Sequence, residues 1–202
     1  MGPLPPPHVS WHIEKMSLQR MVLASILFAL APGWAAAEVV DSAANGFTVK
    51  TTLSIHAAPA DVYGHLIHDV SDWWSPDHTF SGNSANLRME EEAMGCFCEA
   101  LPNEGSVRHM EIVFVAPGRK LVLSGALGPL QTMAATGTMT IQFSAVEGGT
   151  RLEVVYAVAG YAPAGMNTWA APVDMVLGEQ FTRLKNYVEK GDPAPKVAGA
   201  RQ

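Results

Sequence analysis

Residues 136–159 read TGTMTIQFSAVEGGTRLEVVYAVA and carry the strongest structural signal in the chain. Apolar and polar residues alternate through both halves, as at Ile141 and Phe143 in the first and at Val154 and Tyr156 in the second. A period of two is expected of a strand with one buried face. Because a pair of glycines separates the halves, the stretch is predicted to be an antiparallel hairpin of two long strands.

The same reasoning extends outward to a long antiparallel meander. Pro102, Pro117 and Gly128 mark the turns between further runs of strand-forming residues. Seven strands are predicted in all, at 47–55, 87–93, 96–101, 107–115, 120–125, 136–146 and 151–159.

Two segments have helical character. The segment from Pro59 to Pro76 is predicted to form one or two short helices, since a proline suits a first helical turn. The segment from Pro172 to Lys190 carries an apolar stripe and is followed by Gly191, a residue suited to a C-cap. At 1.5 Å per residue this second helix would be about 28 Å long, enough to cross a curved sheet.

The N-terminus resembles an export signal. Residues 16–37 contain a basic residue, a short apolar run, a Pro-Gly break and three alanines, which is the layout of a secretory signal peptide. We therefore expect a periplasmic or secreted protein that begins at Glu38 and keeps no integral membrane anchor. Residues 1–15 are expected to be unstructured or to precede the true start, and residues 192–202 to form a tail.

Composition excludes several classes of function. Removal of Glu14, Lys15 and Arg20 with the signal leaves 11 basic and 18 acidic residues of the original 13 and 19, a formal charge of −7. A nucleic-acid partner is not expected, because phosphate backbones attract basic proteins. The chain lacks a P-loop, a dinucleotide fingerprint, a nucleophile elbow and an HExxH motif, so no cofactor is expected.

The order of these elements resembles the START/SRPBCC helix-grip superfamily, whose members include lipid-transfer, polyketide cyclase/dehydrase-like and heat-shock ATPase activator-like proteins. The resemblance covers residues 46–191 and rests on PADVYGHLIHDVSDWW, GCFCEALPNEGSVRHMEIVFVAPGRKLVLSG, EGGTRLEVVY and GEQFTRLKNYVEKG. It implies an α+β fold in which an antiparallel curved sheet of about seven strands wraps a long C-terminal helix, with two short helices after the first strand. It also implies an apolar cavity between the sheet and the helix.

Our first hypothesis is an exported protein that binds a small hydrophobic molecule in this cavity. The glycine-rich loops GALGPLQ and GYAPAGMNTW would form its entrance. The residues expected to contact the ligand are Trp73, Trp74, Met139, Ile141, Phe143, Val154, Tyr156, Val173, Leu177 and Phe181.

The alternative is a polyketide cyclase/dehydrase-like enzyme that acts on a substrate in the same cavity. Such an enzyme needs a titratable group aimed at the substrate, and His109, His78 and Glu99 are the candidates. A third hypothesis, an activator of a cytosolic chaperone ATPase, conflicts with the export signal.

The two cysteines admit three interpretations. If Cys98 lies opposite His109 and Cys96 opposite Glu111, the four side chains share one face and could hold zinc. A slip of one residue, which places Cys98 opposite Met110, disperses them. We favour reduced core cysteines over a metal site. The remaining possibility is a Cys96–Cys98 disulfide, which needs a kink because alternate Cα atoms in an extended strand lie about 6.6 Å apart.

Overall fold

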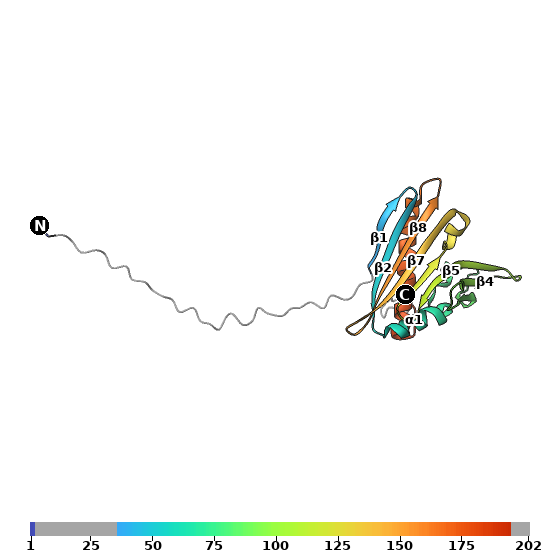
Figure 1. The fold of residues 1–202 in the computed structure, drawn as a ribbon, viewed down its shortest axis with the longest axis horizontal. Coiled ribbons are helices and arrows are strands. Elements are labelled where there is room, and N and C mark those ends of the chain that lie inside the picture. The colour runs from blue at the N-terminus through green and yellow to red at the C-terminus, as the bar shows by residue number, and fades with distance from the viewer. Residues whose placement is uncertain (3–35, 195–202) are drawn as a thin grey trace, which may run out of the picture. The chain divides into compact units, whose positions relative to one another are not determined.

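The computed structural model describes residues 1–2 and 36–194 and has the predicted α+β helix-grip architecture. One antiparallel sheet has the strand order β1-β2-β8-β7-β6-β5-β4-β3, and a long helix lies along one of its faces (Figure 1). The strands are β1 (Ala36–Ala43), β2 (Gly46–Ile55), β3 (Leu87–Met89), β4 (Cys96–Ala100), β5 (Ser106–Ala116), β6 (Lys120–Ser124), β7 (Ala134–Val146) and β8 (Gly149–Tyr161). The α-helices are α1 (Pro59–His68), α2 (Val70–Trp73) and α3 (Ala170–Lys190), and the short 3-10 helices are η2 (Pro76–His78), η3 (Ser84–Asn86), η4 (Gly128–Thr132) and η5 (Met166–Trp169).

The predicted hairpin of β7 and β8 is confirmed, and it lies between β2 and β6 in the sheet. Each strand has 13 residues, and Ile141 pairs with Val154 while Met139 pairs with Tyr156. Gly149 has a φ of 153°, and a Cβ at this position would lie 2.1 Å from the Ile55 carbonyl oxygen. The second glycine of the turn is therefore required by the close approach of β2 as well as by its own backbone conformation.

The sheet has eight strands, not seven, because β1 was not predicted. It lies N-terminal to the expected domain boundary at residue 46 and pairs with β2, with Glu38 opposite Lys50 and Ala43 opposite Gly46. From Glu38 onward all its residues are exposed. A strand whose described side chains are all exposed has no alternation of buried and exposed positions, which explains why the pattern failed to reveal it.

The third strand is shorter than predicted. It was expected at 87–93 but ends at Met89, after which residues 90–95 form a loop that leads into β4. The Glu90 carboxylate accepts a hydrogen bond from the Cys96 backbone N–H at 2.9 Å, and Met94 has a φ of 71°. A run of three glutamates thus forms a connection instead of continuing the strand.

The long helix α3 is confirmed, and it begins at Ala170, two residues before the predicted start. It packs against β1 and β2 and against α1 and α2. Leu177, Phe181 and Leu184 are buried on its inner face, and Gly191 caps it in the left-handed conformation with its N–H bonded to the Tyr187 carbonyl at 2.8 Å.

No helix among residues 36–194 is long and apolar enough to cross a membrane. The predicted signal peptide and the segment before it fall almost entirely outside the described residues.

Candidate functional site

A β-bulge in the hairpin of β4 and β5 positions the central side chain of the site. Cys96 pairs with Glu111, but Cys98 pairs with Arg108, so the register changes by one residue between them. His109 is the extra residue on β5. Neither uniform register that was predicted is correct, because the bulge joins two registers within one hairpin.

The cysteines form a disulfide with each other, so the favoured prediction of reduced cysteines is wrong. Their Cα atoms lie 5.3 Å apart. This is shorter than the spacing of about 6.6 Å in an extended strand and falls within the range that a disulfide spans. The kink in β4 that was expected to accompany such a disulfide is present at Phe97, between the two cysteines and opposite the bulge of β5.

The zinc ligand set does not assemble. The sulfur atoms of Cys96 and Cys98 are bonded to each other, and Glu111 forms an ion pair with Arg108 at 2.8 Å. His109 is turned away from them toward Glu99. Within residues 36–194, no three His, Cys, Asp or Glu side chains converge as a metal site.

Glu99 and His109 instead form a buried pair. The His109 Nε2 atom lies 2.9 Å from a Glu99 carboxylate oxygen, and the exposed fractions of the two side chains are 5% and 0%. Glu99 also accepts hydrogen bonds from the backbone N–H groups of Phe80 and Ser81. The rings of Phe80 and Phe97 pack against the imidazole, with centroid distances of 5.8 and 4.9 Å.

The surroundings set the charge of each partner. Burial lowers the pKa of His109 and outweighs the opposite effect of the Glu99 carboxylate, so the imidazole is neutral at pH 7. Burial raises the pKa of Glu99, but hydrogen bonds from Ser81, Phe80 and His109 together outweigh it and hold this pKa below its usual value. The pair is therefore a carboxylate that orients a neutral imidazole through Nε2–H and leaves Nδ1 unprotonated.

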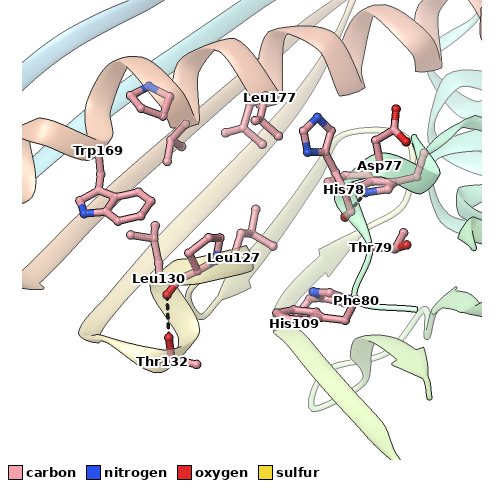
Figure 2. A pocket seen from close by; sticks show the side chains of 16 residues that line it. Asp77, His78, Thr79, Phe80, His109, Leu127, Leu130, Thr132, Trp169 and Leu177 are labelled. Atoms are coloured by element: carbon pink, nitrogen blue, oxygen red, sulfur yellow. Dashed lines mark hydrogen bonds between the residues drawn. The ribbon is translucent and has the colours of Figure 1, made fainter. Parts of the chain in front are cut away.

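His109 faces a pocket of about 590 Å³. Figure 2 shows the pocket between α3, the segment 127–132 and the segment 77–80, with Phe80 and His109 side by side on one wall. The lining residues are Trp74, Asp77, His78, Thr79, Phe80, His109, Leu127, Gly128, Pro129, Leu130, Thr132, Trp169, Pro172, Val173, Val176 and Leu177.

Three of the ten predicted ligand-contacting residues, Trp74, Val173 and Leu177, line this pocket. The other seven lie in the packed core: Trp73, Met139, Ile141, Phe143, Val154, Tyr156 and Phe181. The pocket is thus displaced from the middle of the sheet toward the N-terminal half of α3. Side chains from α1 fill the middle of the sheet. The ring centroids of Tyr63, on α1, and Phe143, on β7, lie 5.5 Å apart.

His78, the second predicted base, lies at the rim of the pocket. Its Nε2 atom is 3.3 Å from the Glu179 carboxylate, and its side chain is 31% exposed. Solvent screens this exposed ion pair more strongly than it screens the buried pair of Glu99 and His109. The Trp74 indole N–H donates to the His78 backbone carbonyl at 3.0 Å, a contact that holds the backbone of His78 and not its imidazole.

The two glycine-rich loops that were expected to form the entrance border the pocket through Leu127, Leu130 and Trp169. No pattern in the sequence indicates what holds the first loop. The Tyr156 hydroxyl donates to the Gly125 carbonyl at 3.1 Å and accepts from the Leu127 N–H at 3.2 Å. Tyr156 was predicted to contact ligand, but it is fully buried and anchors the loop from below.

The segment on the opposite side is held by α3. Gln180 is fully buried, and its side-chain oxygen accepts a hydrogen bond from the Ser75 N–H at 2.8 Å. Arg183 donates to the Trp73 carbonyl at 2.9 Å. These two contacts fix the start of the segment that carries His78 and Phe80 to the pocket wall.

The chain matches no model of a protein family, and no curated protein matches its sequence. Solved structures do resemble it. The conserved protein of unknown function EF2215 from Enterococcus faecalis aligns with a TM-score of 0.53 at 14% identity, over 82% of each chain. CalU16 from Micromonospora echinospora aligns with a TM-score of 0.50 at 15% identity, over 80% of this chain and 87% of that one. DynU16, from the dynemicin biosynthetic locus, aligns with a TM-score of 0.50 at 13% identity, over 74% of this chain and 49% of that one. At these identities the likeness concerns the fold: this chain shares with them an antiparallel sheet closed by a long C-terminal helix.

Proposed function

We propose that this protein binds a small, largely apolar molecule in the pocket that His109 faces. The observation that carries the proposal is the combination of an apolar lining with a single buried, oriented imidazole. The volume of about 590 Å³ falls in the range of about 300–1,000 Å³ usual for small-molecule sites. The bound molecule is held mainly by burial against Leu127, Leu130 and Val173.

The polar contact of the ligand is expected at His109. Among the described residues, Glu99 alone hydrogen-bonds to the imidazole, and it does so through Nε2. The unprotonated Nδ1 atom is then an acceptor for a hydroxyl, phenol or enol group of the ligand. The ligand class that fits is an apolar body with one weakly acidic donor.

We also propose that binding takes place outside the cytoplasm, in the periplasm or after secretion. The layout of residues 16–37 supports this proposal. The helix-grip architecture supports a place in the START/SRPBCC superfamily, and the likeness to DynU16, a protein of a biosynthetic locus, supports a biosynthetic small molecule as ligand.

Filling the pocket tests the binding proposal. In Val173→Phe the new ring occupies the volume that a ligand would fill. Titration with Nile red should therefore give no increase in fluorescence, while the protein stays folded. Met175→Phe is the matched control, because Met175 lies on the same helix but is 69% exposed and outside the pocket. A thermal shift screen of fatty acids, isoprenoids and aromatic polyketides should find a ligand that stabilises the native state by about 2.7 kcal/mol at a hundredfold excess over Kd. Equal binding of Nile red by both variants, with no stabilising ligand in the screen, would reject the proposal.

The Glu99–His109 pair favours a second candidate, a polyketide cyclase/dehydrase-like enzyme. A neutral imidazole held by a carboxylate can take a proton from a substrate carbon next to a carbonyl, while Glu99 stabilises the imidazolium that forms. A ligand recovered in chemically altered form would show turnover. His109→Gln should abolish that turnover and keep Nile red binding, whereas His78→Gln should leave turnover in place. Turnover that survives His109→Gln would exclude this assignment.

A further inference from the structure

The disulfide and the candidate site belong to one structural unit. The register change of the β4–β5 hairpin falls between Phe97 and Cys98, and therefore between the two bridged cysteines. Cys96 keeps the register that pairs it with Glu111, and Cys98 takes the register that pairs it with Arg108. The bridge shortens β4 at the position where β5 carries its extra residue.

The bulge decides which way His109 points. In a hairpin without a bulge that keeps Cys96 opposite Glu111, Cys98 would lie opposite His109. Side chains alternate between faces, so His109 would then share the face of the two cysteines and point away from Glu99. The observed contact of 2.9 Å between His109 and Glu99 therefore depends on the bulge.

We propose that the Cys96–Cys98 disulfide is a reversible redox site, and that its reduction straightens β4, removes the bulge and withdraws His109 from the pocket. The proposal concerns the regulation of the pocket and so rests on the proposed function for its biological consequence. Its structural content, the change in register, does not depend on any ligand.

The backbone of the hairpin turn is a second observation in favour of a change of register. In the bridged form the Leu101 N–H bonds to the Gly105 carbonyl at 2.8 Å, which leaves Asn103 and Glu104 in the left-handed region with φ values of 58° and 62°. Two successive non-glycine residues in this region are uncommon. In the bridged form the turn between Leu101 and Gly105 has three residues, 102–104. The regular register would pair Leu101 with Ser106 and give a turn of four residues, so the chain would no longer have to adopt the three-residue turn.

The chemistry requires a dithiol as reductant. One thiolate of the dithiol attacks the Cys98 sulfur and forms a mixed disulfide, and the electron pair of the broken S–S bond goes to the Cys96 sulfur. The Arg88 guanidinium, whose Nη2 lies 3.8 Å from the Cys96 sulfur, stabilises that leaving thiolate. The second thiol of the dithiol then displaces Cys98 and leaves as the cyclic disulfide, and the protein has gained two electrons and two protons.

Nuclear magnetic resonance on the full-length protein tests the proposal. In the oxidised protein, cross-strand nuclear Overhauser effects should join Cys98 to Arg108 and the His109 ring to the Phe97 ring. After reduction with dithiothreitol, Cys98 should instead show cross-strand contacts to His109, and the contacts between the rings should be lost. Reoxidation should restore the first pattern.

A double variant and a chemical probe complete the test. Cys96→Ser/Cys98→Ser should show the pattern of the reduced protein with or without dithiothreitol. Modification of His109 by diethyl pyrocarbonate should accelerate on reduction toward the rate of His56, whose side chain is 78% exposed. An unchanged register in protein that has gained two hydrogens by mass would overturn the proposal. Unfolding on reduction would also overturn it, because the bridge would then be a structural cross-link. Failure of the oxidised protein to bind Nile red would count against the proposed function alone.

Discussion

Removal of one hydroxyl group should loosen the wall of the pocket. In Tyr156→Phe the ring remains in the core, but the oxygen that bonds to the Gly125 carbonyl and the Leu127 N–H is lost. Tyr156 is fully buried, and burial raises the pKa of its hydroxyl to about 12, so the group acts as a neutral donor and acceptor at any ordinary pH.

The size of the effect follows from the two hydrogen bonds. Each contributes about 0.5–1.5 kcal/mol to the free energy of unfolding, and two backbone groups lose their partner. The surroundings of Gly125 and Leu127 are only partly buried, so water can reach them and limit the loss. We expect a destabilisation of about 2 kcal/mol, which corresponds to a fall in Tm of about 4–8 °C for a domain of this size.

The matched control is Tyr63→Phe. Tyr63 is also buried, but its hydroxyl has no hydrogen-bond partner within the described part of the chain. Burial and, secondarily, the neighbouring Glu91 carboxylate raise its pKa. Removal of a buried hydroxyl without a partner is expected to be neutral or stabilising.

Urea unfolding of both variants measures the difference, and Nile red titration reports on the pocket. Tyr156→Phe should lower both the free energy of unfolding and the affinity for Nile red. If the two variants differ in unfolding free energy by less than about 0.5 kcal/mol, the two hydrogen bonds do not hold the loop and the reasoning is refuted.

Three further outcomes are expected. Burial holds the pKa of His109 below its usual 6.5, so the unfolded chain takes up the proton at a higher pH than the folded protein does. The free energy of unfolding should therefore decrease as the pH falls through 6.5. In urea titrations at several pH values, His109→Gln should flatten this dependence. Glu99→Gln removes the carboxylate that raises the pKa of His109, so the ring should titrate at a still lower pH by nuclear magnetic resonance; an upward shift would contradict the assigned pair. Protein recovered from the exporting cell should begin at Glu38 by intact mass, and a product that retains residues 16–37 would contradict export.

Much of the fold was predictable because it depends on periodicity. The strands of the β7–β8 hairpin are long and have one buried face, so buried residues alternate with less buried ones from Gly137 to Phe143 and from Thr150 to Val158. The helix α3 has both an apolar stripe and a terminal glycine at Gly191. The strand β1 was missed because its side chains from Glu38 onward are all exposed and show no such pattern.

The site was less predictable because periodicity identifies a buried face but not what covers it. Met139 and Phe143 face inward as predicted, yet core side chains and not a pocket lie against them. Whether a buried position adjoins another side chain or an empty volume depends on where α1 and α3 cross the sheet, and the sequence of a strand does not encode that.

The bulge at His109 was not predictable for a different reason. Phe97, Cys98 and Glu99 are all buried, so β4 has no polar face that would favour one register. His109 and Glu99 were both predicted as candidate titratable groups, but their mutual contact depends on a shift of one residue.

The order of the strands also bears on when this chain can acquire its structure. β2 pairs along its whole length with β8, from Gly46 opposite Ala159 to Ile55 opposite Thr150, so about half the chain separates the partners. A polypeptide that leaves a ribosome or a translocation channel from its N-terminus must expose β1 and β2 until β8 has emerged, and α3 can cover them only after that. The Cys96–Cys98 bridge joins residues two apart and can form while the chain is still emerging. This topology therefore predicts a long-lived unfolded precursor, in which chaperones have an extended window to act and in which the hairpin that carries His109 can be shaped before the sheet closes.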